Sequence, residues 1–88
     1  MDLQYDPDKA ASNLRKHGVS FPGATGVFSD PLVIHSEDVS AVGEVRFIAL
    51  GMSLTFKVLT VAYTFRGDDI RLISARRATK PEVKAYEG

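Results

Sequence analysis

The chain has 88 residues, of which 44% are hydrophobic and 25% charged, with no cysteine and a formal net charge of zero. This length and balance predict a single domain over residues 1–88 and exclude a disulfide framework or a thiolate metal site. Because no stretch approaches the roughly 20 apolar residues of a membrane span and the start lacks a signal-peptide pattern, we expect a cytoplasmic protein without membrane association.

The neutral total hides an uneven distribution of charge. Residues 1–45 contain three Lys or Arg and seven Asp or Glu, a net charge of −4, whereas residues 46–88 contain eight and four, a net charge of +4. The basic half also carries the strongest strand patterns. A cationic sheet indicates an anionic partner.

The first expected element is a helix that begins at Pro7 and ends near His17. Asp6 is a good N-cap, proline suits the first helical position, and Gly18 follows a basic last turn. On this helix, the residues expected to share one face are Ala10, Leu14 and His17. A second, shorter helical segment is expected to begin at 20–23 and to close at 30–31, with Ala24, Val27 and Phe28 as its buried side.

Beyond residue 31 the hydrophobic period changes from about 3.6 to 2, which predicts strands. Four are expected, over 32–35, 44–52, 57–66 and 70–75, with a mobile polar connection over 36–43 and a tight turn at 67–69. Thr79 and Glu82 form a capping box for a last helix that runs through Tyr86. The expected fold class is α+β: a small antiparallel sheet of about four strands with two N-terminal helices and one C-terminal helix.

Strict alternation along the last strand divides its side chains between the two faces of the sheet. One set is Ile70, Leu72, Ser74 and Arg76. The opposing set is Arg71, Ile73, Ala75 and Arg77. Helices are expected over one face, with the other partly open.

Basic residues near the strand ends are the first candidates for a site. The group consists of Arg66, Arg71, Arg76, Arg77 and Lys80. Guanidinium groups match phosphate oxygens in a bidentate way and stay charged at any working pH. The alternative is that these side chains are solvated and pair with Asp68, Asp69 or Glu82.

Three further residues could exchange protons. His17 lies at a helix end, where the alternative is an interaction with the helix dipole. Glu82 and Tyr86 are four residues apart and share a helix face, where the alternative is that the tyrosine anchors the helix and the glutamate completes its cap. The absence of a phosphate-binding glycine loop and of a carboxylate cluster disfavours nucleotide hydrolysis and two-metal nuclease chemistry.

Several segments in combination resemble the BrnT toxins, which are RelE-like ribonucleases. These segments are YDPDKA at 5–10, NLRKHGVSF at 13–21, VFSDP at 27–31 and IRLISAR at 70–76. The resemblance spans nearly the whole chain and includes Glu82 and Tyr86. One departure is Phe65, where related proteins often carry a polar, commonly acidic, residue.

The resemblance implies a bacterial type II toxin that cleaves RNA, blocks translation and is neutralised by a BrnA-type antitoxin, with operator DNA bound only through the toxin–antitoxin complex. Because an exposed sheet face or edge could pair with another copy or with an antitoxin segment, a dimer of toxin–antitoxin units is one expected assembly. The family's polar motif residues correspond to His17, Arg66, Arg76, Glu82 and Tyr86.

Metal-independent cleavage requires the 2′-hydroxyl to attack the adjacent phosphate, with groups that accept and donate protons and cations that stabilise the added charge. We expect Arg66 and Arg76 to converge on the phosphate, His17 or Glu82 to accept a proton, and Tyr86 to orient or protonate the leaving group. The remaining cations would hold the RNA backbone. They are Arg46, Lys57, Arg71, Arg77 and Lys80. No metal ion or cofactor is expected.

A second hypothesis is a catalytically inactive interaction module that binds an acidic partner or an antitoxin. Phe65 gives this hypothesis some support. Direct DNA binding is a weaker third hypothesis, because no recognition helix with basic and amide side chains is evident.

Overall fold

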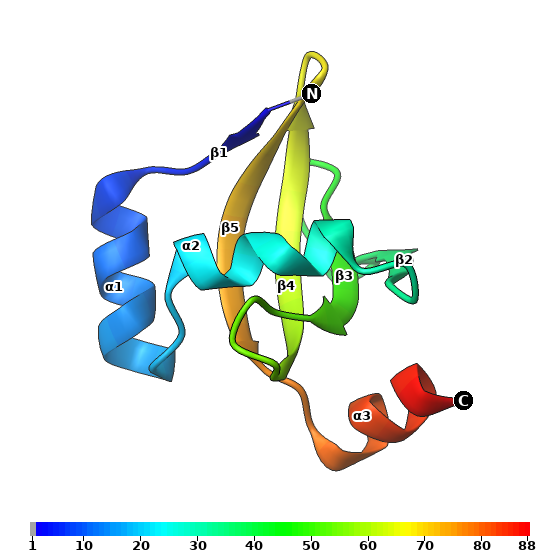
Figure 1. The fold of residues 1–88 in the computed structure, drawn as a ribbon. Helices are drawn as coiled ribbons and strands as arrows, with labels where there is room; N and C mark the ends of the chain where they lie inside the picture. Colours follow the sequence, from blue (N-terminus) through cyan, green and yellow to red (C-terminus); the bar gives the residue numbers. More distant parts are fainter. Residues whose placement is uncertain (1) are drawn as a thin grey trace.

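In a computed structural model, which describes residues 2–88, five strands form one sheet with two helical segments on one face and a short helix at the end of the other. The strands are β1 (Leu3–Gln4), β2 (Ile34–Glu37), β3 (Phe47–Met52), β4 (Val58–Arg66) and β5 (Asp69–Arg77). The helices are α1 (Pro7–His17), α2 (Phe21–Ala24) and α3 (Lys80–Glu87), with a 3-10 helix, η1 (Thr25–Ser29), continuing α2. The α+β class is therefore confirmed (Figure 1).

The sheet order is β1-β5-β4-β3-β2. The last four strands pair antiparallel as predicted, but β1 pairs in parallel with β5, so the sheet is mixed and has five strands. Two residues give no periodic signal, which is why the sequence does not reveal β1. Figure 1 shows α1 beside the β5 edge and α2 crossing in front of β4 and β5, whereas α3 lies apart at the lower end.

Helix α1 has the predicted bounds because its two ends are fixed by local chemistry. The Asp6 side chain accepts a hydrogen bond from the Asp8 amide at 2.9 Å, and Gly18 ends the helix in the left-handed region at φ 69°. Of the residues expected to share one face, Ala10 packs against the core. The one buried residue of α1 is Asn13, whereas Leu14 is 52% exposed.

The other predicted boundaries shift by a few residues. Strand β2 begins at Ile34 because Asp30 holds the preceding residues in a turn, where its side chain and carbonyl accept from the amides of Leu32 and Val33. The hairpin between β4 and β5 turns at Gly67, whose φ of 61° suits glycine. The capping box at Thr79 is present.

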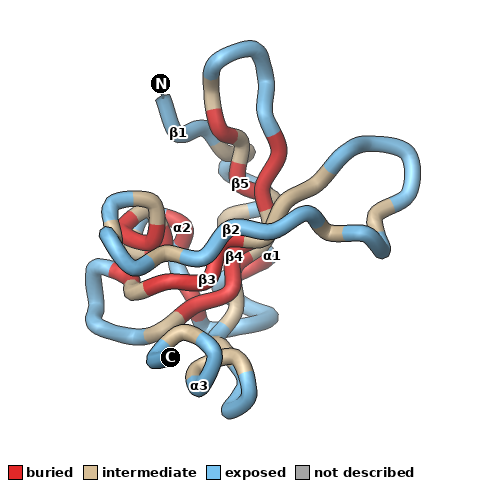
Figure 2. The backbone as a smooth tube through the Cα atoms, turned by 90° about the vertical axis from the view of Figure 1, so that its right-hand side faces the viewer, coloured by how far each residue is buried: buried red, intermediate tan, exposed pale blue. Residues whose placement is uncertain are grey.

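The core lies between the helix-covered face of the sheet and the α2–η1 segment. Its fully buried large side chains are Phe21, Val27, Val61 and Leu72. Figure 2 shows that the buried residues lie mainly in β3, β4 and β5 and in the α2 segment, with exposed segments around them. Burial of this face fixes which side of the sheet each strand residue occupies.

A β-bulge on β5 changes the predicted distribution of side chains. Ala62 pairs with Ser74 and Tyr63 pairs with Leu72, so Ile73 is the extra residue. Ile70, Leu72, Ala75 and Arg77 consequently share the helix-covered face, whereas Arg71, Ser74 and Arg76 share the other face. The predicted strict alternation was therefore wrong beyond Ile73.

Candidate functional site

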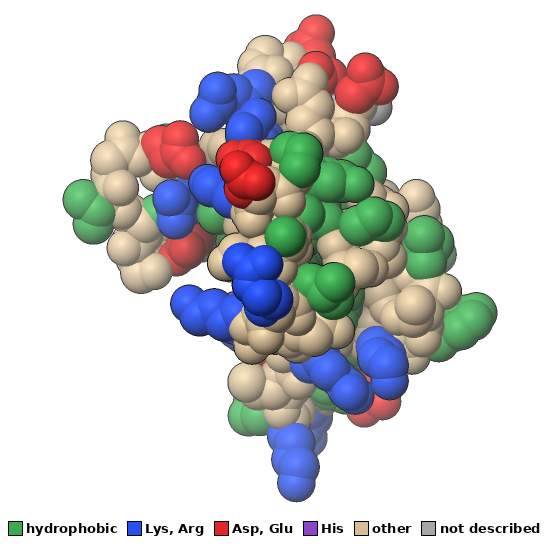
Figure 3. All heavy atoms as spheres, turned by 90° about the vertical axis from the view of Figure 1, so that its left-hand side faces the viewer, with side chains coloured by type: hydrophobic (Ala, Val, Ile, Leu, Met, Phe, Trp, Pro, Cys, Tyr) green, Lys and Arg blue, Asp and Glu red, His purple; other side chains and the backbone are tan. Residues whose placement is uncertain are grey.

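The face of the sheet opposite α2 carries three of the predicted arginines. Arg66, Arg71 and Arg76 point to this side, according to the strand register. We call the surface made by these arginines and by Lys9, Lys16 and His17 of α1 the cationic face. Figure 3 shows Lys and Arg side chains spread down the side of the molecule that α1 and β5 occupy.

Asn13 positions α1 against the exposed edge of β5. Its side-chain amide donates to the Ala75 carbonyl at 2.8 Å and to the Val19 carbonyl at 2.9 Å, and its oxygen accepts from the Ala75 amide at 3.0 Å. The two bonds to Ala75 satisfy backbone groups of an edge strand that would otherwise lack partners. They also fix the orientation of α1, so that residues three and four positions away from Asn13 face β5.

A shallow pocket of about 270 Å³ lies where α1 meets β5. His17, Lys9 and Lys16 line it together with Ser74 of β5. None of the three basic side chains forms a salt bridge within residues 2–88. The pocket therefore combines an imidazole with two free ammonium groups, which is an environment that favours an anion.

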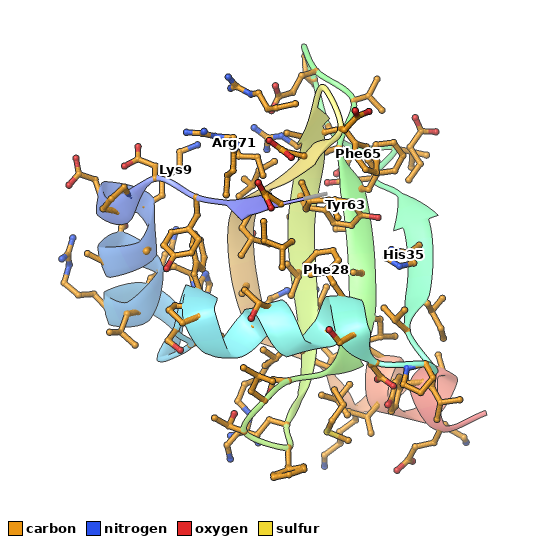
Figure 4. All side chains as sticks on the ribbon, turned by 45° about the horizontal axis from the view of Figure 1, so that its top comes forward. Lys9, Phe28, His35, Tyr63, Phe65 and Arg71 are labelled. Atoms are coloured by element: carbon orange, nitrogen blue, oxygen red, sulfur yellow. The ribbon has the colours of Figure 1, made fainter. Side chains whose placement is uncertain are left out.

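The upper end of this surface belongs to Arg66 and Arg71. Figure 4 shows Lys9 and Arg71 reaching the same end of the molecule from α1 and β5. The alternative that Asp68 or Asp69 would pair with these arginines was wrong, since Asp69 instead accepts hydrogen bonds from the Gln4 side chain and the Asp2 amide.

At the lower end, Arg76 is paired with α3. Its guanidinium donates to both carboxylate oxygens of Glu82, at 2.8 Å and 3.1 Å. This hydrogen bonding lowers the pKa of Glu82 to about 2 and raises the pKa of Arg76. Glu82 is consequently a bound carboxylate at neutral pH, which makes it a weak proton acceptor.

Tyr86 secures the far end of α3. Its hydroxyl donates to Oδ2 of Asp30 at 2.5 Å, and the same oxygen accepts from the Met52 amide at 2.8 Å. The bond lowers the pKa of Asp30 and raises that of Tyr86. Glu82 and Tyr86 do share a helix side, as predicted, but each is engaged in holding α3 to the sheet.

The expected convergence of Arg66 and Arg76 on one phosphate was wrong. In the strand register, Arg66 lies opposite Asp69 at the hairpin end of the sheet, whereas Arg76 lies opposite Thr60, six residues before Arg66 on β4. At about 3.3 Å per residue, the two positions are roughly 20 Å apart along the strand. A single phosphate cannot contact both.

The predicted backbone-binding cations do not form one surface either. Lys57 and Arg77 line a different pocket, on the helix-covered side of the sheet. Arg46 pairs with Glu44 at 3.6 Å, and Lys80 begins α3. Of this group, only Arg71 belongs to the cationic face.

Sequence reasoning overlooked Lys9, Lys16 and Ser74 as possible site residues, and Asn13 as the residue that positions them. Positions 9, 13, 16 and 17 follow a helical repeat, and this repeat is a signal that could have identified them. The contribution of Ser74 depends on the bulge, for which the sequence offers no comparable signal.

Comparisons with known proteins agree with this fold. A family model described as the ribonuclease toxin BrnT of type II toxin–antitoxin systems matches residues 5–82. The crystal structure of the Brucella abortus ribonuclease toxin BrnT is similar in fold, with a TM-score of 0.66 and 24% sequence identity over 91% of this chain and 99% of that one. No curated protein matches the chain.

The class defined by the fold and the family model is a small α+β ribonuclease toxin of a type II toxin–antitoxin system. More particularly, the chain belongs to the BrnT family. No helix within residues 2–88 is long and apolar enough to cross a membrane.

Proposed function

We propose that this toxin cleaves RNA on the cationic face, without a metal ion, by attack of a ribose 2′-hydroxyl on the adjacent phosphate. The observation that supports the proposal is the pocket between α1 and β5, where His17 lies with two unpaired ammonium groups beside Ser74. RNA cleavage by the toxin would inhibit translation, and a BrnA-type antitoxin would neutralise it.

The cations of this face would serve two purposes. Lys9 and Lys16 would stabilise the charge that develops on the phosphorane in the pocket, because preorganised cations stabilise such a transition state more than the ground state. Arg66, Arg71 and Arg76 would hold phosphates on either side of the pocket along the strand direction, a contribution that weakens as salt rises.

Proton transfer would begin at His17. Imidazole is the side chain best suited to accept a proton near neutral pH, and His17 is exposed at the end of α1. Glu82 is a weaker candidate because its pKa is about 2. The proton from the 2′-hydroxyl would pass to His17, the bond from phosphorus to the 5′-oxygen would break, and the ammonium group of Lys9 or Lys16 would protonate that oxygen. The products would be a 2′,3′-cyclic phosphate and a 5′-hydroxyl.

The proposal is tested by incubating the purified toxin with RNA in excess EDTA and mapping the cleaved ends. We expect cleavage to persist and the His17→Ala variant to lose roughly 100-fold or more in rate, the usual contribution of a general base. His35→Ala is the matched control, because His35 lies on β2 and bonds to Tyr63 at 2.7 Å. Loss of cleavage in EDTA, or full activity in His17→Ala, would contradict the proposal.

A second candidate function is an inactive interaction module. The bidentate pairing of Arg76 with Glu82 favours it, because that guanidinium is already occupied. Induced expression in a bacterial host separates the two candidates. An active ribonuclease arrests growth, and expression of the antitoxin restores it. Unimpaired growth with a stably folded toxin would favour the interaction module.

A further inference from the structure

A second pocket, of about 280 Å³, lies on the other side of the sheet from the cationic face. It is bounded by the end of α1, by α2, by the turn at 53–57 and by the ends of β4 and β5. Its apolar lining includes Leu14, Val19, Ala24 and Leu59. Leu14 is 52% exposed, whereas Val19, Ala24 and Leu59 are buried.

Two cations stand at this pocket, Lys57 and Arg77. Arg77 is there because the bulge at Ile73 moves it to the helix-covered side. Neither side chain forms a salt bridge within residues 2–88, and none of the residues lining the pocket is acidic. An apolar pocket with two unpaired cations is complementary to a ligand that is both apolar and anionic.

The adjacent turn presents large apolar side chains to solvent. Leu54 is 63% exposed and Phe56 is 87% exposed. Phe56 also adopts a φ of 61°, in the left-handed region that bulky residues rarely occupy. Strained backbone clusters at functional sites, and neighbouring exposed apolar side chains mark interaction surfaces.

We infer that this pocket is the docking site for an acidic amphipathic segment of the antitoxin, which would place an aliphatic or aromatic side chain in the pocket and carboxylates on Lys57 and Arg77. The inference rests on the proposed function, because it takes an antitoxin as the partner. We refer to the pocket, its two cations and the apolar side chains of Leu54 and Phe56 as the docking surface.

RNA fits this pocket less well. The pocket contains no aromatic ring on which a base could stack, and Phe56 beside it is the one aromatic ring of the docking surface. The two hydroxyls in the lining are engaged locally: Ser20 accepts from the Gly23 amide at 3.1 Å, and Thr55 bonds to Ser53 at 3.0 Å. The pocket therefore offers little for reading a base edge, whereas apolar side chains suit it.

The test titrates the toxin with the purified antitoxin encoded beside it, and with overlapping synthetic peptides that cover the antitoxin sequence. We expect one acidic peptide to bind. The Leu14→Glu and Arg77→Glu variants of the toxin should each bind the antitoxin and this peptide at least tenfold more weakly. The matched controls are Leu32→Glu and Arg15→Glu, two exposed positions outside the docking surface, which should bind normally. Thermal melts establish that every variant is folded.

Exchanging the charges makes the test specific to the contact between Arg77 and the acidic residues of the peptide. Replacing the acidic residues of the bound peptide by lysine should abolish binding to the unmodified toxin and restore it to the Arg77→Glu variant. Equal binding by all variants, or displacement of the peptide by a short RNA, would overturn the inference.

The outcome remains separable from the proposed ribonuclease activity. Leu14 has no part in the cationic face, so Leu14→Glu should leave RNA cleavage by antitoxin-free toxin unchanged while it weakens neutralisation. If the toxin cleaves no RNA but Leu14→Glu still weakens antitoxin binding, the proposed function fails and the docking surface stands. If the toxin cleaves RNA and antitoxin binding is unaffected, the docking surface is overturned.

Discussion

Arg76 and Glu82 form a bidentate pair that joins the end of β5 to α3, with nitrogen–oxygen distances of 2.8 Å and 3.1 Å. The pair determines how much of the Arg76 charge is available to RNA. Because a carboxylate and a phosphate compete for the same guanidinium fork, the ion pair should oppose RNA binding at this end of the cationic face.

We therefore expect Glu82→Gln to bind RNA more tightly than the unmodified toxin and to retain cleavage. Arg76→Ala should bind RNA more weakly, with a smaller loss of affinity at high salt, because its guanidinium holds a phosphate beside the reacting one. Filter binding and cleavage assays at two salt concentrations measure these effects. Arg15→Ala is the control, as an exposed α1 arginine outside the cationic face. Weaker RNA binding by Glu82→Gln would show that the carboxylate supports the site rather than competing with RNA.

The attachment of α3 to the sheet should weaken at low pH. The pKa of Glu82 is lowered from 4.5 to about 2 in the folded protein, so its stabilising contribution is complete above pH 4.5 and is lost as the pH falls toward 2. Asp30, whose pKa is also lowered, acts in the same direction through Tyr86. With allowance for solvent screening, the Glu82 contribution is about 1 to 2 kcal/mol.

Amide NMR signals of α3 should consequently move toward unfolded positions between pH 4.5 and 2, before those of β4. In Glu82→Gln the α3 signals should be shifted already at neutral pH and should change less on acidification. If the α3 and β4 signals change together in one transition, the helix does not detach separately.

Asn13 should be among the most sensitive positions for stability. Asn13→Ala removes three hydrogen bonds and leaves buried groups of Ala75 and Val19 without partners, which should cost about 2 to 4 kcal/mol of unfolding free energy. Urea unfolding followed by circular dichroism measures the loss. Ser12→Ala, at the exposed neighbouring position, should change stability by less than about 0.5 kcal/mol. Equal effects of the two substitutions would contradict the role assigned to Asn13.

Phe65 should affect stability more than RNA cleavage. It is 48% exposed and contacts Phe47 and Tyr63 with ring centroids 5.4 Å and 5.8 Å away, on the face opposite to Arg66. We expect Phe65→Glu to lower the unfolding free energy by about 1 to 2 kcal/mol through these lost contacts.

The rate of RNA cleavage by Phe65→Glu should stay close to that of the unmodified toxin, when both are measured well below their melting temperatures. Phe65→Tyr, which keeps the ring, is the matched control for stability. A large gain in cleavage on introduction of the glutamate would instead place this position in the ribonuclease site.

The amino-acid sequence by itself determined the elements whose ends depend on neighbouring residues. The bounds of α1 follow from Asp6 and Gly18, the start of α3 follows from Thr79 and Glu82, and the hairpin follows from Gly67. In each case a side chain or a backbone preference acts within a few residues of itself, so the physical cause is visible in the sequence.

The tertiary structure decided which side chains lie together on one surface. The bulge at Ile73 decides which side of the sheet Arg76 and Arg77 each occupy, and the hydrogen bonds of Asn13 with Ala75 bring α1 against β5. Both depend on contacts between segments far apart in the chain. A periodic pattern shows that a face is buried, but it does not show which distant strand or helix will cover it, and the composition of the site depends on that packing.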